Sequence, residues 1–154
     1  MNRRINDVLA VITKKLENED IQYVIVGSTS LALQGLPLEP RDIDIATTKN
    51  SLVLIQNKLE EYIKVKMERR LSKINLRLGF KKYAYFLTLE INGIKVDAMS
   101  NFKIKNTPLK YKKEDIVFID LKGLKVPCLS IKKTYSAYVL AENKEKVELI
   151  KPYL

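Results

Sequence analysis

The sequence contains no histidine, no tryptophan and only one cysteine, Cys128. Without histidine the chain cannot form a Ser-His-Asp or Cys-His triad, use an imidazole as general base, or hold a metal through imidazole. A lone cysteine excludes an internal disulfide and a cysteine zinc site, and we expect it to be buried and inert. Any chemistry must therefore come from carboxylates, amines, hydroxyls and backbone groups.

Long hydrophobic runs are also missing. No stretch of the sequence reaches the roughly 18 uninterrupted apolar residues that a membrane-spanning helix needs. The opening residues MNRRINDVLAVITKKLENED place Ile5, Val8, Leu9, Ile12 and Leu16 on one face of a helix. Charges interrupt this stripe too often for a signal peptide. We therefore expect a cytoplasmic protein that does not associate with membranes.

Length and composition predict an ordinary folded domain. The 154 residues are 46% hydrophobic and 30% charged, which is typical of globular proteins and not of disordered chains. A chain of this length is large enough to bury a core. The expectation is a single domain over residues 1–154.

The positive charge is concentrated in one part of the chain. The formal net charge is +10, and residues 64–113 contain 14 of the 28 basic residues and 3 of the 18 acidic ones, a net of +11. Such a block attracts nucleic acid, nucleotides or other polyanions. The alternative interpretation is a lysine-rich face that interacts only with solvent.

Apolar periodicity and turn residues divide the chain into short elements. Helices are predicted at residues 3–18, 28–35, 51–62, 130–140 and 143–149, the third with Asn50 as its N-cap. Strands are predicted at residues 21–26, 42–47, 83–91, 94–99, 116–121 and 124–126. Asn92-Gly93, typical of a type I′ turn, joins one hairpin, and Lys122-Gly123 joins a second. This order predicts an α/β (or α+β) fold with a mixed β-sheet flanked by helices.

The segment VIVGSTSLALQGLPLEPRDIDIAT, residues 24–47, has the clearest chemical signal. A buried strand is predicted to end at Gly27, and a helix begins directly after it. The first N–H groups of a helix are unpaired and lie at the positive end of the helix dipole, an arrangement that binds phosphate. Gly27 allows a ligand to approach the backbone, and Ser28 adds a hydroxyl donor.

Two acidic residues follow on the next predicted strand. Asp42 and Asp44 are two residues apart, so both carboxylates lie on one face while the isoleucines beside them face the core. Adjacent carboxylates repel each other unless a cation offsets their charge, and Mg²⁺ binds in this way together with substrate phosphates. A third carboxylate on a neighbouring strand would complete a two-metal site. Asp97 in the first hairpin is the leading candidate, and Glu90 is the other acid in that region.

These residues resemble the polymerase-beta-like nucleotidyltransferase superfamily, in which GS at a strand–helix junction precedes a D-x-D strand and a later acid. The GSxxLALxG helix and the P-x-D-I-D-I strand are similar to those of small prokaryotic nucleotidyltransferases of antibiotic-adenylylating and toxin type. The resemblance implies a nucleotidyltransferase fold in which Gly27 and Ser28 hold the triphosphate. It also implies that Asp42, Asp44 and Asp97 are catalytic and hold two Mg²⁺, or Mn²⁺, ions.

The implied reaction is metal-dependent transfer of a nucleoside monophosphate from an NTP, first of all ATP, to an acceptor, with release of pyrophosphate. One alternative is a non-catalytic nucleotide- or RNA-binding module that keeps the fold. Another is a toxin-type nucleotidyltransferase that acts with a partner protein, and a homodimer is a further expectation. Arg41 is expected to contact phosphate or to offset the two acids, unless it pairs with Asp42 or Glu39 instead.

The basic block bears on the acceptor. Residues 64–82 precede the hairpin and should lie beside it, and Lys95 should share a face with Asp97. We expect this surface to form one wall of the active-site cleft and to recruit a polyanionic acceptor such as RNA. Three aromatic residues of the hairpin either stack on a base or, as is commoner, belong to the core: Tyr83, Tyr85 and Phe86.

Overall fold

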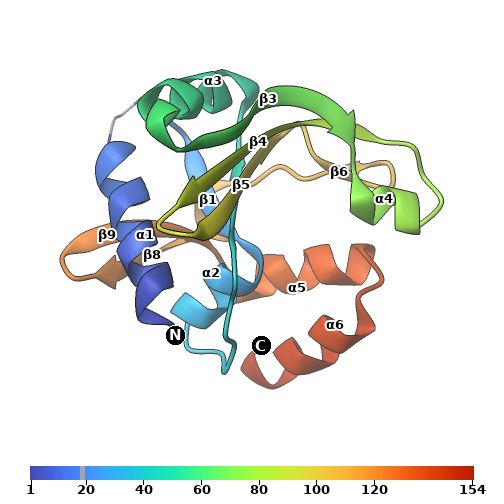
Figure 1. Ribbon diagram of the computed structural model, residues 1–154. Helices are drawn as coiled ribbons and strands as arrows, with labels where there is room; N and C mark the ends of the chain where they lie inside the picture. Colours follow the sequence, from blue (N-terminus) through green and yellow to red (C-terminus); the bar gives the residue numbers. More distant parts are fainter. Residues whose placement is uncertain (18–19) are drawn as a thin grey trace.

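The computed structural model describes residues 1–17 and 20–154 and contains a seven-stranded mixed sheet with helices on both sides (Figure 1). The helices are α1 (Arg3–Lys15), α2 (Gly27–Leu33), α3 (Lys49–Lys58), α4 (Lys73–Arg77), α5 (Ile131–Leu140) and α6 (Lys144–Ile150). The strands are β1 (Tyr23–Val26), β2 (Ile43–Thr47), β3 (Ile63–Leu71), β4 (Tyr83–Ile91), β5 (Ile94–Ser100), β6 (Lys103–Ile104), β7 (Thr107–Pro108), β8 (Ile116–Leu121) and β9 (Leu124–Leu129). The predicted fold class is therefore confirmed.

The strand order of the large sheet is β3-β4-β5-β2-β1-β9-β8, which puts β2 at its centre. β2 runs parallel to β5 and β1 runs parallel to β9, whereas the other neighbours are antiparallel. The register places Asp44 between Val26 of β1 and Asp97 of β5. The central strand thus brings together residues that are far apart in the sequence.

The core lies between one face of the sheet and the helices α1 and α3. Ile5, Leu9 and Ile12 of the predicted stripe are fully buried in one cluster with Ile43 and Ile45 of β2. Burying each such side chain contributes about 1.5–3 kcal/mol. Because successive strand residues point to opposite faces, the residues between the core isoleucines face away from α1 and α3. We call this opposite surface of the sheet the cleft face.

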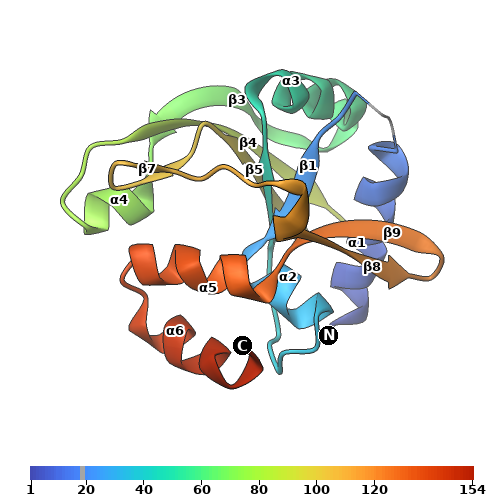
Figure 2. The same cartoon turned by 180° about the vertical axis from the view of Figure 1, so that it is seen from behind.

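A second, smaller cluster joins α2 to the C-terminal helices. Leu31 and Leu36 are buried with Ile150 of α6, and Tyr135 and Tyr138 of α5 pack against them. Figures 1 and 2 both show α5 and α6 side by side at the end of the sheet where α2 lies. This packing places α5 next to the junction between β1 and α2.

Both predicted hairpins are confirmed. β4 and β5 pair from Tyr85–Ser100 to Ile91–Ile94, and the turn residues Asn92 and Gly93 have φ values of 50° and 76°. Positive φ at both central positions is what a type I′ turn requires. The second hairpin joins β8 to β9 and extends to Leu129, beyond the predicted end at residue 126, so Cys128 lies inside β9. Cys128 is fully buried, and burial raises the pKa of its thiol to about 12, as expected of an inert cysteine.

Some predicted boundaries were wrong. Helix α3 has Thr48 as its N-cap, not Asn50, because the Thr48 hydroxyl accepts the N–H of Ser51 at 3.1 Å. The helix ends at Lys58, and a 3₁₀ turn over Glu60–Tyr62 completes the predicted range. Helix α1 ends at Lys15 with Leu16 as its C-cap, and the predicted end at Asn18 lies outside the described residues. None of the described helices combines the length and the apolar composition of a membrane-spanning segment.

Strand β3 and helix α4 were not predicted. β3 reads IKVKMERRL, where charges interrupt the alternation, and its pairing with β4 shifts register twice. An edge strand tolerates these charges because only one of its sides is paired. Helix α4 has five residues, too few for a periodic signal, and Ser72 caps it by accepting the N–H of Asn75.

Candidate active site

Asp44 and Asp97 lie side by side on the cleft face. They are register partners in the parallel pair β2–β5, and such partners point to the same side of a sheet. Gly27, at the start of α2, completes this centre. A Cβ added to Gly27 would be 3.2 Å from Asp44 Oδ2, and the residue has a φ of +67°. Both the contact and the backbone conformation therefore favour glycine at this position.

The environment of Asp44 disfavours its charge. Burial raises the pKa of the Asp44 carboxyl to about 7, and the carboxylates of Asp42 and Asp97 act in the same direction. Lys95 opposes this effect by lowering the pKa. A cation that binds beside this carboxyl would stabilise its charged form and lower its pKa.

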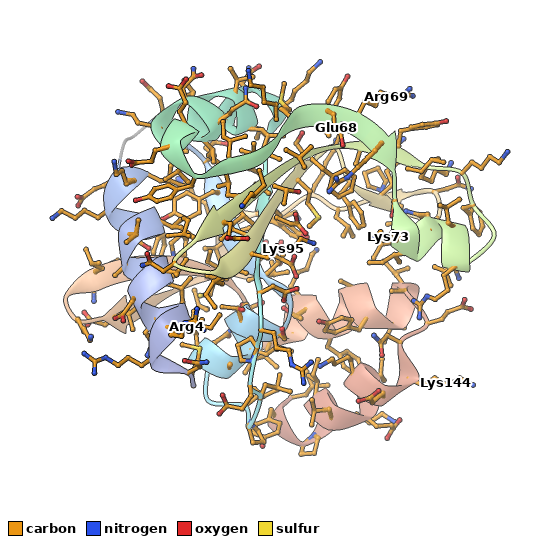
Figure 3. The ribbon with its side chains drawn as sticks, viewed as in Figure 1. Arg4, Glu68, Arg69, Lys73, Lys95 and Lys144 are labelled. Carbon is orange, nitrogen blue, oxygen red and sulfur yellow. The ribbon has the colours of Figure 1, made fainter. Side chains whose placement is uncertain are left out.

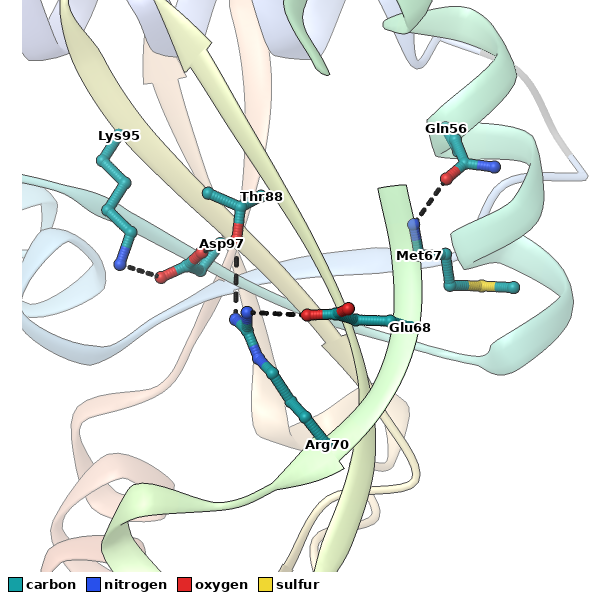
Figure 4. A network of polar contacts seen from close by, with 7 residues as sticks. All are labelled: Gln56, Met67, Glu68, Arg70, Thr88, Lys95 and Asp97. Carbon is teal, nitrogen blue, oxygen red and sulfur yellow. Dashed lines mark hydrogen bonds and ion pairs between the residues drawn. The ribbon is translucent and has the colours of Figure 1, made fainter. Parts of the chain in front are cut away.

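Asp97 is held by partners on both of its oxygens (Figure 4). Lys95 Nζ lies 2.6 Å from Oδ2, and the Thr88 hydroxyl donates to Oδ1 at 2.7 Å. The expectation that Lys95 shares the face of Asp97 is confirmed, and an ion pair with a nearby lysine is present. Glu90 pairs instead with Lys64 at 3.6 Å near the hairpin turn, away from the two aspartates.

The prediction that Asp42 belongs to the strand was wrong, because β2 begins at Ile43 and Asp42 lies in the bend before it. The charge of Asp42 nevertheless acts on both Asp44 and Lys95. Its carbonyl oxygen accepts the hydroxyl of the buried Thr29 at 2.7 Å, which ties the start of β2 to α2. Arg41 is exposed, and its side chain pairs with neither Asp42 nor Glu39 in the described structure. Arg41 is thus free to contact a ligand.

The position of α2 is fixed by polar contacts. The buried Ser30 hydroxyl donates to the carbonyl of Leu129 at 2.7 Å, and the Gln34 amide donates to the same carbonyl at 2.9 Å. Gly35 follows the helix with a φ of +96°, as predicted for its closing residue. Gly27 and the half-buried Ser28 are therefore held rigidly beside the end of β1.

Tyr138 of α5 is a site residue that the sequence did not indicate. Its hydroxyl would lie 3.9 Å from a Cβ on Gly27, and burial raises the pKa of this phenol to about 12, with Asp44 and Asp42 contributing. Tyr138 therefore stays a hydrogen-bond donor near the carboxylates at neutral pH. No local spacing relates α5 to β2, so only the packing of α5 against α2 reveals the contact.

A polar network links Asp97 to strand β3 (Figure 4). Arg70 Nη2 lies 3.5 Å from the Thr88 hydroxyl, and Arg70 Nη1 pairs with Glu68 at 3.4 Å. Strand β3 is fixed from the other side, because the Met67 N–H donates to the Gln56 side chain at 2.6 Å. The prediction that the basic segment lies beside the hairpin is confirmed by the pairing of β3 with β4.

A large cleft opens over this centre. Gly27, Asp44 and Asp97 line it, together with α5 and with α4 and the neighbouring segments. Phe86 also lines the cleft, since it is the register partner of Met99 on the cleft face. Tyr85 alternates with Phe86, and its side chain packs against the core and contacts Lys49, as the commoner interpretation of these aromatic residues expects.

The three aspartates of the site have the oxygen ligands that a divalent cation needs, although they are not arranged as a complete coordination shell. The carboxylates of Asp42, Asp44 and Asp97 concentrate negative charge at one point, and the Lys95 ammonium is the cation that offsets it. Within residues 1–17 and 20–154, no three acidic or cysteine side chains form a preassembled metal cluster. Asp42, Asp44 and Asp97 are the residues that would hold a divalent cation, and Asp97 would first have to exchange its ion pair with Lys95 for that cation.

Solved structures share this architecture. The structure of TM1012 from Thermotoga maritima, a protein assigned as a nucleotidyltransferase, is 30% identical, with a TM-score of 0.78 over 99% of this chain and 94% of that one. The antibiotic-resistance enzyme ANT(2″)-Ia, bound to adenylyl-2″-tobramycin, is 11% identical, with a TM-score of 0.59 over 96% of this chain and 87% of that one. The lincosamide adenylyltransferase LnuA, bound to lincomycin, is 12% identical, with a TM-score of 0.57 over 98% and 96%.

Fold and sequence relatives together define a nucleotidyltransferase of the polymerase-beta-like superfamily. Within it, the chain belongs to the aminoglycoside-2″-adenylyltransferase family, whose profile matches residues 8–149. A search of curated protein sequences gives no significant match.

Proposed function

We propose that the protein transfers a nucleoside monophosphate from an NTP, first of all ATP, to an acceptor hydroxyl or phosphate and releases pyrophosphate. The observation that carries the proposal is the pairing of Asp44 with Asp97 beside Gly27, on the cleft face of a nucleotidyltransferase fold. Such a reaction uses the NTP supply of the cytoplasm, where we place the protein.

Each site residue has a role in this proposal. The backbone of Gly27 and the hydroxyl of Ser28 would bind the triphosphate, and the unpaired Arg41 side chain would contact its phosphates. Asp42, Asp44 and Asp97 would hold Mg²⁺ or Mn²⁺ as a two-metal site. When bound, the divalent ions would neutralise the phosphates and acidify the acceptor hydroxyl.

Side chains of the site would also accept the proton of the acceptor hydroxyl and orient the reacting groups. The acceptor oxygen forms a bond to the α-phosphorus while the bond from that phosphorus to pyrophosphate breaks. Asp97 takes the acceptor proton, since no histidine is available. The Thr88 hydroxyl, which donates to Asp97, would orient that carboxylate. Lys95, which pairs with Asp97 in this structure, would move to pair with the phosphates instead.

The proposal is tested by following the two ends of the triphosphate. ATP labelled at the α-phosphorus and ATP labelled at the γ-phosphorus are incubated separately with the protein, Mg²⁺ and fractionated cell RNA, protein and small molecules. We expect α-label in one acceptor fraction and γ-label in pyrophosphate only. Asp44→Asn should abolish both signals and keep the circular dichroism spectrum. Transfer at the wild-type rate by this variant would disprove the assignment.

The alternatives give other outcomes of the same experiment. RNA binding without Mg²⁺-dependent ATP binding would indicate a non-catalytic module. Activity that appears only after a second protein is added would indicate a partner-dependent enzyme of toxin type. Light scattering during gel filtration would detect a homodimer.

A further inference from the structure

One side of the cleft carries positive charge well beyond what a triphosphate needs. We define the basic arm as residues 70–82 and 103–110, which include the end of β3, α4, β6 and β7. These two segments contain eight basic residues and no acidic residue. Figure 3 shows Lys73 of the arm at α4, beside the opening between α4 and α5.

Most of this charge is not neutralised by the protein. Three side chains of the arm are engaged, because Arg70 and Lys105 form ion pairs and Arg77 donates to a backbone carbonyl. The other five form no ion pair with any described residue, and all of them line the cleft: Lys73, Lys81, Lys82, Lys103 and Lys110. Like charges gathered in a cleft raise the local concentration of anions.

The arm is a fixed wall. The buried Asn75 side chain donates to the carbonyl of Lys103 and accepts the N–H of Lys105, both at 2.6 Å, so α4 is locked to the segment that contains β6. Arg77 donates to the carbonyl of Ala141 at 2.7 Å, and Lys105 pairs with Glu142 at 3.5 Å. These contacts attach the arm to the end of α5 and close that end of the cleft.

The arm leads directly to the proposed catalytic centre. The Arg70 guanidinium lies 4.5 Å from the centre of the Phe86 ring and also reaches the hydroxyl of Thr88, which holds Asp97. Phe102 meets Phe86 edge to face, with 6.5 Å between ring centres. Both rings are half-buried. Basic groups beside aromatic rings are the usual means of binding single-stranded nucleic acid, since phosphates and bases are both engaged.

The charges oppose an aminoglycoside acceptor. Tobramycin, the acceptor in the ANT(2″)-Ia complex, is an amino sugar and therefore a polycation at neutral pH. Such a ligand needs carboxylates, but the acidic residues lining the cleft are Glu17 and the two catalytic candidates Asp44 and Asp97. A polycation would instead meet the unpaired lysines of the arm.

We propose that the basic arm binds the acceptor of the reaction, and that this acceptor is the hydroxyl-bearing end of a single-stranded nucleic acid. The inference rests on the proposed function for the transfer step, but the binding surface can be tested separately. Phosphates lie along the lysines of the arm, and the terminal base stacks at Phe86. The terminal hydroxyl then reaches the α-phosphorus beside Asp97.

The test replaces three exposed lysines of the arm. Lys73, Lys81 and Lys103 are changed together to Gln, and the matched control changes Lys14, Lys58 and Lys66, which are exposed and do not line the cleft, to Gln. Both variants lose the same charge. A fluorescent 12-nucleotide single-stranded RNA and a DNA of the same sequence are titrated at two salt concentrations, and Mg²⁺-ATP binding is measured by calorimetry.

The arm variant should bind the oligonucleotides at least about tenfold more weakly, with a salt dependence reduced by about two released ions. Its affinity for Mg²⁺-ATP should stay within about twofold, and the control variant should resemble the wild type in both respects. A preference between RNA and DNA identifies which of the two is the acceptor. Equal losses in the two variants would overturn the proposal, because only net charge would then matter.

Acceptor competition separates this inference from the proposed function. Wild-type protein, Mg²⁺ and α-labelled ATP are given the oligonucleotide, a sugar phosphate or tobramycin. Label on the oligonucleotide alone supports the inference, and label on either of the other two overturns it. Loss of Mg²⁺-ATP binding and of all transfer, with oligonucleotide binding that still depends on the arm, would reject the proposed function and keep the arm as a nucleic-acid site.

Discussion

Asp44→Asn should stabilise the protein when divalent cations are absent, even though Asp44 is the centre of the proposed active site. Burial, with Asp42 and Asp97 acting in the same direction, raises the pKa of the Asp44 carboxyl from 3.8 to about 7. The folded protein therefore binds this proton more tightly than the unfolded chain does. The contribution of Asp44 to stability is therefore greatest at low pH and falls as the pH rises from about 4 to about 7.

The size of the effect follows from the change in pKa. Each tenfold change in proton affinity corresponds to about 1.4 kcal/mol, so ionised Asp44 lowers the free energy of unfolding by about 4 kcal/mol above pH ~7. In a domain of this size about 1 kcal/mol moves the Tm by about 2–4 °C. In EDTA at pH ~8 the Asn variant should therefore melt about 8–16 °C above the wild type, and at pH ~4 the two should nearly coincide.

Thermal melts followed by circular dichroism at these two pH values measure the difference. Asp120→Asn is the matched control, because the Lys125 ammonium, helped by the Gly123 N–H, lowers the pKa of Asp120. The same replacement at this position should lower the Tm at pH ~8 instead of raising it. Added Mg²⁺ should raise the Tm of the wild type and leave that of Asp44→Asn unchanged. An Asp44→Asn protein that melts at or below the wild type at pH ~8 would refute the reasoning, as would an equal difference at both pH values.

Two further changes test the site and the arm. Gly27→Ala places a Cβ 3.2 Å from Asp44 Oδ2 at a φ of +67°, so calorimetry should show weaker Mg²⁺-ATP binding. Gly35→Ala is its control, with a φ of +96° and open space around the Cβ, and should cost about 1 kcal/mol in melts without affecting ATP. Asn75→Ala leaves two partly buried backbone groups of the arm, the carbonyl of Lys103 and the N–H of Lys105, without their partner, so the urea midpoint should fall by an amount equivalent to about 1–3 kcal/mol. An unchanged midpoint would contradict the role of Asn75 as the lock of the arm.

The catalytic half of the site could be predicted because its signals are local. Gly27 and Ser28 follow an apolar strand directly, and alternation along β2 puts Asp44 on the face opposite the core isoleucines. Asp97 was a candidate because Asn92-Gly93 marked the hairpin that contains it, but only the register of β2 with β5 places it beside Asp44.

The rest of the site depends on long-range packing. Tyr138 approaches the carboxylates only because α5 packs on α2, and Thr88 reaches Asp97 only through the register of β4 with β5. Strand β3 was missed because its charges mask the alternation, although the same charges marked the segment as basic. Alternation predicts that Lys95 and Asp97 lie on one face of the strand, but it does not tell whether Asp97 pairs with Lys95 or binds a metal ion.

The division between local and long-range signals matches a division of function. The proposed reaction requires a fixed arrangement of a glycine, a hydroxyl and carboxylates, for which residues 24–47 and one acid from β5 are the candidates. The proposed recognition of the acceptor requires only a surface of suitable charge, for which the candidate is the basic arm, held by Asn75 and the end of α5. Charge on an exposed arm can change without disturbing the core, because α1 and α3 bury the opposite face of the sheet. If the proposals hold, the charge of the basic arm can set the acceptor of this protein without altering the residues proposed for the transfer reaction.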